Sequence, residues 1–249
     1  MIARIAAKRC KNAPLSRGPR RFSALAMMFL RRAAVILALF ATGLTCAAPI
    51  DARRAKPVGK GLVRVRLVTS QGPIVLALEA RRAPATTANF LAYVDDHRFD
   101  GTSFYRAARR KADPRFGFIQ GGIQTDARRI LPPFPLEPTN KTGVLHLDGA
   151  ISMARRADPD SAGGNFIITL GPIPSLDATA TSPGYAAFGY VISGRATMER
   201  ILAATTGGGT DSMRGQMIIH PIRLIRAERL DGVPKPTGQV KPWLIKVPR

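Results

Sequence analysis

The stretch LVRVRLVTSQGPIVLALE, residues 62–79, places this chain among β-rich proteins. Apolar and polar residues alternate over residues 62–69, which is the period of a strand with one buried face. The tetrapeptide SQGP at 70–73 indicates a tight turn, and residues 74–79 form a second apolar run. Two such runs around a short turn predict an antiparallel hairpin.

Working outward, further apolar runs of strand length follow, separated by turn residues. They lie at residues 103–106, 116–121, 150–154, 165–170, 187–193 and 217–230. Helical spacing occurs over residues 86–94, where the preceding Pro84 suits a first turn, and again over residues 196–204, before three glycines. Short strands with two isolated helices predict a mainly β fold, a closed barrel capped by helices.

The first 48 residues have the organisation of a secretory signal peptide. An arginine pair at 31–32 precedes the apolar run AAVILALFATGL at 33–44, and small residues follow it. The run is shorter than the roughly 20 apolar residues of a transmembrane helix. We therefore predict an exported chain that is cleaved near Ala47 or Ala48. An uncleaved signal that anchors the chain in the membrane is the alternative.

The remaining boundaries follow from composition. Residues 1–26 precede two methionines and are interpreted as an over-long gene start. Residues 49–61 are polar and basic and read as a linker, which leads to a domain at residues 62–230. Residues 231–249 form a basic, Pro-containing tail that we expect to be poorly ordered, unless the small apolar cluster around Trp243 docks on the barrel.

The charge of the chain is strongly basic but uneven. Lysine and arginine number 38 against 16 acidic residues, a net charge of +22. Residues 1–48 hold nine of the basic residues and none of the acidic ones, which leaves 29 and 16 in the remainder. Such a surface attracts acidic partners, but without a nucleic-acid-binding motif we expect no specific nucleic-acid partner. Both cysteines, Cys10 and Cys46, lie in the signal region, so the domain must rely on its core rather than on disulfides.

The domain has few candidate bases, and its sequence does not support several reaction classes. His97, His146 and His220 have no metal-binding spacing, and the domain offers no cysteine ligand. The sequence has no G-x-S-x-G elbow, no Walker loop and no dinucleotide fingerprint. If the chain is an enzyme, we expect a reaction that needs no metal, no cofactor and no covalent intermediate.

Four blocks of sequence, in order, resemble one known family. They are SQGPIV (70–75) with APATTANF (83–90) and FDGTSFYR (99–106); IQGG (119–122); GAISMAR (149–155) with DPDSAGGNFII (158–168); and SLD (175–177) with GYAAFGYV (184–191). Residues 62–230 thereby resemble the cyclophilin-type peptidyl-prolyl cis-trans isomerases, closest to the exported bacterial members.

The resemblance implies a closed eight-stranded antiparallel β-barrel capped by two α-helices. It implies an enzyme that speeds cis-trans interconversion at Xaa-Pro bonds. The expected partners are proline-containing unfolded or exported polypeptides, met in the periplasm by a monomer that contacts the membrane only during export. The tail follows the last predicted strand, is rich in Pro and Lys and lacks strand alternation, so we expect it to be dispensable for catalysis.

The resemblance also assigns residues. Arg106 occupies the position of the catalytic arginine, whose charged guanidinium is a fixed donor beside the prolyl nitrogen. The substrate-binding positions of the family correspond to Phe118, Gln120, Met153, Ala154, Asn165, Ile167, Leu176 and Tyr185.

Several positions depart from the family pattern and keep other functions open. Tyr105 stands in place of a histidine, and Ile167 in place of a pocket phenylalanine. Gly117 stands in place of an aromatic residue, which is either lost or replaced by Phe116 or Phe118. A less aromatic pocket favours a proline-peptide-binding or chaperone module of the same fold, with weak or no isomerase activity. A basic scaffold for anionic envelope components or nucleic acid is a third reading, and it rests on charge alone.

The signal-peptide interpretation makes a direct prediction about the exported protein. Because small residues follow the apolar run, processing should produce a mature chain that starts near Ala48 or Pro49. N-terminal sequencing of the exported protein measures this. A mature chain that still carries Arg31 would contradict cleavage and favour the membrane anchor.

Overall fold

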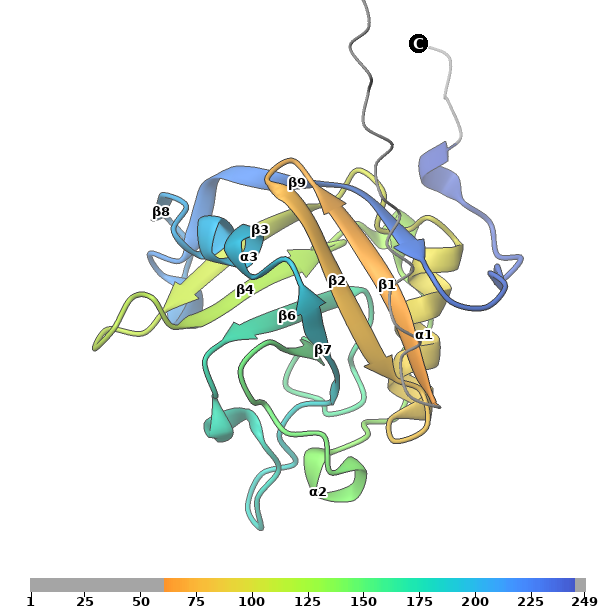
Figure 1. Ribbon diagram of the computed structural model, residues 1–249, viewed down its shortest axis with the longest axis horizontal. Coiled ribbons are helices and arrows are strands. Elements are labelled where there is room, and N and C mark those ends of the chain that lie inside the picture. The colour runs from red at the N-terminus through yellow and green to blue at the C-terminus, as the bar shows by residue number, and fades with distance from the viewer. Residues whose placement is uncertain (1–60, 245–249) are drawn as a thin grey trace, which may run out of the picture. The chain divides into compact units, whose positions relative to one another are not determined.

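Antiparallel strands dominate residues 61–244, the part of the chain that the computed structural model describes (Figure 1). The predicted signal-peptide region and the linker up to residue 60 lie outside the described residues. Within residues 61–244, no helix combines the length and the apolar character needed to cross a membrane.

The strands close into a barrel. Along the described chain they are β1 Leu62–Thr69, β2 Gly72–Glu79, β3 Ser103–Arg109, β4 Gly117–Gly122, β5 Ala150–Met153, β6 Asn165–Leu170, β7 Ala187–Ser193, β8 Thr206–Gly207 and β9 Met217–Arg229. Their order in the sheet is β1-β2-β7-β5-β6-β4-β3-β9-β8, and β1 also pairs with β9. Eight strands therefore form a closed antiparallel ring, with the short β8 beside it, which confirms the predicted barrel.

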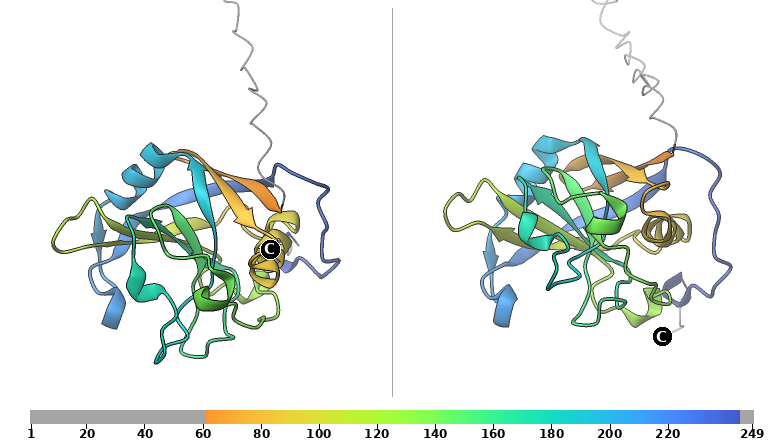
Figure 2. Two further views of the ribbon diagram at one scale, coloured as in Figure 1. Left: turned by 60° about the horizontal axis from the view of Figure 1, so that its bottom comes forward. Right: turned by 90° about the horizontal axis from the view of Figure 1, so that it is seen from below.

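The two predicted helices pack on the barrel, and they lie on opposite sides of it (Figures 1 and 2). They are α1 Pro84–Asp95 and α3 Arg195–Leu202, and a single turn, α2 Thr139–Thr142, was not predicted. The carboxylate of Glu137 accepts hydrogen bonds from the backbone N–H groups of Ala85 (3.1 Å) and Thr86 (2.8 Å). A negative charge at the amino end of a helix is stabilising, so the loop before α2 is attached to the first turn of α1.

Aromatic rings fill the centre of the barrel. Phe166 of β6 lies 5.4 Å from Phe90 of α1, 5.5 Å from Phe99 and 5.7 Å from Phe104 of β3, measured between ring centroids, and each pair meets edge to face. All four side chains are fully buried. Edge-to-face pairs add to the stabilisation that comes from burying the rings, so this cluster joins α1 to two strands.

The chain beyond β9 packs against the barrel. Asp231 accepts hydrogen bonds from the backbone N–H and the Nε of Arg64, each at 2.9 Å, and from its Nη2 at 2.6 Å. Lys235 and Thr237 then donate backbone hydrogen bonds to Asp95 and Asp96 at the end of α1, and a final 3-10 turn follows at Pro242–Leu244. Residues 231–244 are thus placed by hydrogen bonds, where the sequence led us to expect a poorly ordered tail, because buried carboxylates at the end of α1 accept bonds from its backbone.

The aromatic cluster predicts the response of the fold to a cavity. Replacing Phe166 with Ala should lower the free energy of unfolding by about 3–5 kcal/mol, because three ring contacts are lost and the closed barrel cannot collapse around the gap. Urea denaturation followed by circular dichroism measures this. The matched control is Ile219→Ala on β9, whose side chain is 55% exposed, and it should cost no more than about 0.5 kcal/mol. Equal losses in the two variants would show that the cluster is not the centre of the core.

Candidate functional site

The register of the strands places three of the predicted site residues in one row. Arg106 of β3 pairs with Gln120 of β4, Gln120 pairs with Ile167 of β6, and Ile167 pairs with Ser152 of β5. Residues that pair directly across antiparallel strands point to the same face of a sheet. Arg106, Gln120 and Ile167 therefore share the outer face, while neighbours such as Ile119 point inward.

The guanidinium of Arg106 is held on several sides. Its Nη1 donates to Oε1 of Gln120 at 3.0 Å, its Nε donates to Oε1 of Gln216 at 2.9 Å, and its Nη2 donates to the carbonyl oxygen of Ser212 at 3.3 Å. The guanidinium carbon lies 5.0 Å from the ring centroid of Phe118, a cation–π contact. A guanidinium carries more N–H groups than these bonds use, so Arg106 keeps donors for a ligand.

The backbone at Gly117 explains the missing aromatic residue. Gly117 has a φ of +144°, and a Cβ atom there would lie 2.0 Å from the carbonyl oxygen of Ala108. No side chain fits this position, so the aromatic ring beside Arg106 comes from Phe118. The ring of Phe116 packs instead at Gly171, where an added Cβ would lie 2.7 Å from it. Of the two replacements that the sequence left open, the structure selects Phe118.

A second polar group lies at the end of β6. The hydroxyl of Tyr105 donates to Oδ1 of Asn165 at 3.2 Å, and the same oxygen accepts the backbone N–H of Gln124 at 2.8 Å. The Nδ2 of Asn165 donates back to the carbonyl oxygen of Gln124 at 2.8 Å. Burial raises the pKa of Tyr105 to about 12, although Gln120 and Arg106 both act to lower it. Tyr105 is therefore a neutral hydrogen-bond donor at physiological pH.

Burial also changes the pKa of Arg106. It lowers the pKa of Arg106 from its ordinary value, and the phenol groups of Tyr105 and Tyr185 act in the opposite direction. Because the starting value is so high, the guanidinium stays charged at neutral pH. A charged donor that is partly removed from water interacts more strongly with a polar ligand than an exposed one does.

The other predicted residues divide into those beside the row and one in the core. Ala154 is half-buried and its N–H donates to the carbonyl oxygen of Asn165 at 2.9 Å. Leu176 and Tyr185 are half-buried, and the Tyr185 N–H donates to the Leu176 carbonyl oxygen at 2.9 Å. Met153 is only 1% exposed and packs in the barrel core. Its side chain therefore does not belong to the surface that a ligand reaches.

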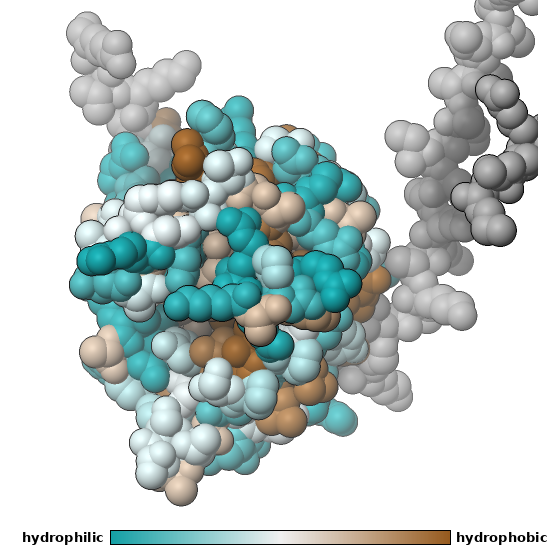
Figure 3. Space-filling model, turned by 90° about the vertical axis from the view of Figure 1, so that its left-hand side faces the viewer, coloured by the Kyte–Doolittle hydropathy of each residue, from teal (hydrophilic) through white to brown (hydrophobic). Residues whose placement is uncertain are grey.

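Hydrophilic side chains cross the side of the molecule that carries β8 and the β3–β4 hairpin, and hydrophobic residues there occur in small groups (Figure 3). The guanidinium carbon of Arg155 lies 4.7 Å from the ring centroid of Tyr185, a cation–π contact. Two hollows, of about 290 and 480 Å³, lie elsewhere on the described surface, and neither is lined by Arg106, Gln120 or Ile167.

A buried polar chain supports the segment that carries Leu176. The Nδ1 of His146 donates to Oδ1 of Asp177 at 2.6 Å, and the hydroxyl of Ser152 lies 2.8 Å from Nε2. These distances are those of a serine-type catalytic triad. However, Ser152 is fully buried and His146 is 1% exposed, so no substrate reaches the hydroxyl. The arrangement instead fastens the turn at Pro174–Leu176 to strand β5.

Three contributors to the site were not found from the sequence. Gln216 and Ser212 reach Arg106 from the loop between β8 and β9, and Gln124 reaches Asn165 from the loop after β4. No spacing signal marks them, because each depends on how a loop folds back. Among the described residues, no group of three or more His, Cys, Asp or Glu side chains is arranged to hold a metal ion.

Comparison with known proteins agrees with this geometry. Residues 64–224 match the family model described as cyclophilin type peptidyl-prolyl cis-trans isomerase/CLD. The chain belongs to the cyclophilin-type peptidyl-prolyl cis-trans isomerases. It is an isomerase by that membership, and the family expected from the four sequence blocks is confirmed.

Similar peptidyl-prolyl cis-trans isomerases occur in bacteria and eukaryotes. The chain is 30% identical over 164 residues to a peptidyl-prolyl cis-trans isomerase of Acinetobacter baylyi, covering 66% of this chain and 84% of the relative. It is 34% identical over 142 residues to peptidyl-prolyl cis-trans isomerase A of Dickeya dadantii, covering 57% and 72%. A cyclophilin-type isomerase structure from Cryptosporidium parvum matches with a TM-score of 0.54 at 22% identity, covering 69% and 99%, which supports the fold.

The buried histidine predicts a pH effect on stability. Burial lowers the pKa of His146 from its usual 6.5, and this outweighs the hydrogen bond and charge of Asp177. Below that value the unfolded chain binds a proton that the folded cyclophilin domain resists. The stability contributed by neutral His146 is thus complete above pH 6.5 and is lost as the pH falls towards the folded pKa.

Urea denaturation at pH 7.5 and at pH 5.5 measures this effect. The wild type should lose stability between the two values, and His146→Gln, which does not titrate but keeps a donor for Asp177, should lose less. The exposed His97 and His220 are present in both proteins. The same loss in both proteins would contradict the assignment.

Proposed function

We propose that this cyclophilin is an exported, periplasmic and monomeric enzyme that isomerises Xaa-Pro bonds in unfolded or exported polypeptides and so assists their folding. The family membership supports the reaction. The arginine pair at 31–32 and the apolar run after it support export. Anchoring by an uncleaved signal is the alternative to a free periplasmic enzyme.

The proposed reaction needs a donor that acts on the twisted peptide bond. Amide resonance sets a rotational barrier of about 18–20 kcal/mol. Twisting breaks the conjugation and leaves the prolyl nitrogen basic, with a lone pair that accepts a hydrogen bond. A donor that meets this lone pair binds the twisted state more tightly than the planar one, which lowers the barrier. We assign this role to Arg106.

The observation that carries this proposal is the restraint of Arg106. Its partners Gln120 and Gln216, and the Phe118 ring, hold the guanidinium before any substrate binds. A donor that is already oriented needs no reorganisation when the peptide bond twists. Gln120 also shares the outer face with Ile167, so it can contact the substrate backbone while it holds the arginine.

The proline side of the substrate would meet the apolar members of the site. We assign Phe118, Ile167 and Leu176 to the proline ring, and the polar Asn165 with the Ala154 backbone to the flanking peptide. Tyr185, with the Arg155 guanidinium over its ring, would form a further edge of this substrate-binding surface. A cyclophilin structure from Cryptosporidium parvum was obtained in the presence of the dipeptide Ala-Pro, which supports a prolyl dipeptide as a first probe.

A peptide-binding module with weak or no isomerase activity is the second candidate. Two observations favour it. Gly117 excludes an aromatic side chain where the family pattern has one, and Ile167 offers a smaller surface than a phenylalanine. Both changes reduce the apolar contact available to a proline ring.

Substitution of Arg106 tests the proposed function. Arg106→Ala should lower the turnover of an Xaa-Pro peptide by about tenfold or more, because a charged donor is lost from a partly dry site. Arg106→Lys should restore only part of the turnover, since an ammonium lacks the planar fork. The KM should change less than kcat, because the contact strengthens in the twisted state. A protease-coupled assay measures both quantities.

Arg66→Ala is the matched control, because Arg66 is a half-exposed arginine on β1 that pairs with Glu228. It should keep wild-type turnover, and circular dichroism should show all variants folded. Full activity in a folded Arg106→Ala protein would remove Arg106 from the mechanism. An inactive wild type that still binds proline peptides would establish the binding module instead.

A further inference from the structure

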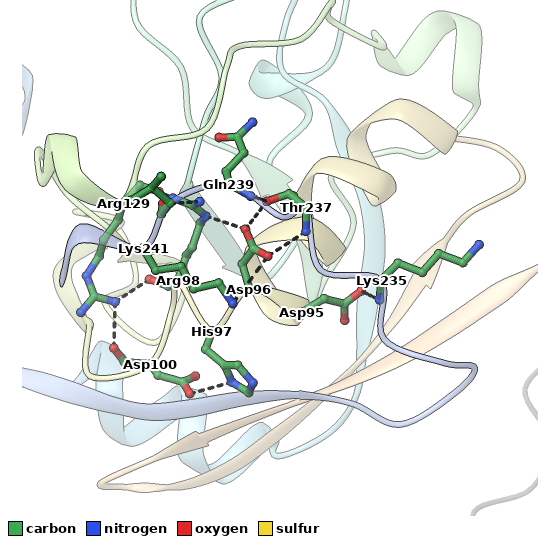
Figure 4. Close-up of polar contacts among 11 residues, drawn as sticks. Asp95, Asp96, His97, Arg98, Asp100, Arg129, Lys235, Thr237, Gln239 and Lys241 are labelled. Carbon is green, nitrogen blue, oxygen red and sulfur yellow. Dashed lines mark hydrogen bonds and ion pairs between the residues drawn. The ribbon is translucent and has the colours of Figure 1, made fainter. Parts of the chain in front are cut away.

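The segment after β9 turns back across the carboxyl end of α1 (Figure 4). The backbone N–H of Lys235 donates to Oδ2 of Asp95 at 2.9 Å. The backbone N–H of Thr237 donates to Oδ1 of Asp96 at 2.8 Å, and its hydroxyl donates to Oδ2 of the same carboxylate at 2.5 Å. The segment is attached through its backbone, at the end of a helix.

These bonds provide hydrogen-bond partners for two buried carboxylates at the end of α1. The Asp95 and Asp96 side chains are almost fully buried, at 1% and 0% exposure, and they stand where the helix dipole is negative. Buried carboxylates without partners are costly. Arg229 pairs with Asp95, and Nε of Arg98 donates to Asp96 at 2.9 Å. The N–H groups of the returning segment supply the rest.

Trp243 attaches the far end of the segment. Its ring lies 4.7 Å from the guanidinium carbon of Arg98 and 5.2 Å from that of Arg129. The two arginines are joined to each other, because Nη1 of Arg98 donates to the carbonyl oxygen of Arg129 at 3.2 Å and Nη1 of Arg129 donates to that of Arg98 at 2.7 Å. The Val240 carbonyl oxygen accepts Nη2 of Arg98 at 3.4 Å. The indole thus covers the junction of two loops.

Arg129 lies in the same loop as Gln124, a residue of the candidate site. It closes the 3-10 turn at Ala127–Arg129, which is capped by Asp126. Two residues before that cap stands Gln124, whose N–H and carbonyl both bond to Asn165. Gln124 has a φ of 54°, a left-handed conformation that is unfavourable for a residue with a side chain. Contacts on both sides must therefore hold it, with Asn165 on one side and the turn on the other.

We propose that residues 231–244 form a strap and that Trp243 is a positioning residue for substrate binding. The strap holds the 124–129 turn through Arg129, and the turn holds Asn165 through Gln124. A released strap lets the turn move, so Asn165 loses its fixed orientation toward the peptide. This role rests on the proposed function, and it opposes the expectation that the tail is dispensable for catalysis.

Trp243 is the single tryptophan of the chain, so its fluorescence reports on the strap. The variants are Trp243→Ala, Trp243→Phe and Thr237→Val in the full chain, with Val233→Ala, in the same segment at 78% exposure, as the matched control. Kinetics on an Xaa-Pro peptide are measured well below the unfolding midpoint of each variant. Trp243→Ala should raise KM about three- to tenfold, the range for losing cation–π contacts, with kcat nearly unchanged.

Trp243→Phe should restore part of the affinity, because a smaller ring still stacks on the arginines. Thr237→Val removes one bond to Asp96, so its tryptophan emission should shift to the red and its KM should rise. Val233→Ala should match the wild type. In ¹H–¹⁵N spectra, the backbone amide of Gln124 and the side-chain amide of Asn165 should shift in Trp243→Ala and Thr237→Val but not in the control.

A lower unfolding midpoint with unchanged KM and unchanged amide signals would show that the strap only stabilises the barrel, and this would overturn the proposal. If Trp243→Ala does not fold, the KM and the two amide signals of Thr237→Val decide between positioning and stabilisation alone. An inactive wild type would refute the proposed function and not the strap, because the two amide signals still report whether the strap holds Gln124 and Asn165.

Discussion

The pairing of β1 with β9 is the interaction on which the rest of this cyclophilin structure depends. It turns an open sheet into a closed ring, and a closed ring separates its residues into an inner set and an outer set. The inner set supplies Phe104, Ile119 and Phe166 to the core, while the outer set supplies Arg106 and Gln120. A slip of one residue in any strand would exchange the two sets, so the packing of the core and the composition of the site are fixed together.

Closure also explains how a rigid site arises from distant parts of the chain. Gln120 is 14 residues from Arg106 and Gln216 is 110 residues away, yet both bond the same guanidinium. The strands carry the first contact and a loop between two strands carries the second. Because the strands cannot move independently, the donor is oriented by the fold itself. This is the physical basis for assigning Arg106 a role that requires a fixed charge.

Buried polar groups play a different part in this molecule. His146, Asp96 and Arg98 are all inaccessible, and each joins segments that have no regular pairing with one another. His146 joins β5 to the turn with Leu176, and Asp96 and Arg98 join α1 to the segment after β9. Burying such groups is favourable only when their hydrogen bonds are complete. They therefore specify where loops lie, and the loops in turn border the candidate site.

The sequence by itself determined the eight strands of the ring, both main helices and the family, because alternation and helical spacing are local and the four blocks occur in order. It did not predict the two-residue strand β8. It also predicted Arg106 and Gln120 as site residues, since both lie inside those blocks, and the structure brings the two side chains together. The sequence did not decide between Phe116 and Phe118, which depends on the backbone of Gly117 against Ala108. It missed Gln216, Gln124 and the attachment of Trp243. Those contacts join residues far apart in the chain, and only the closed barrel and the loops folded on it bring them within hydrogen-bonding or stacking distance.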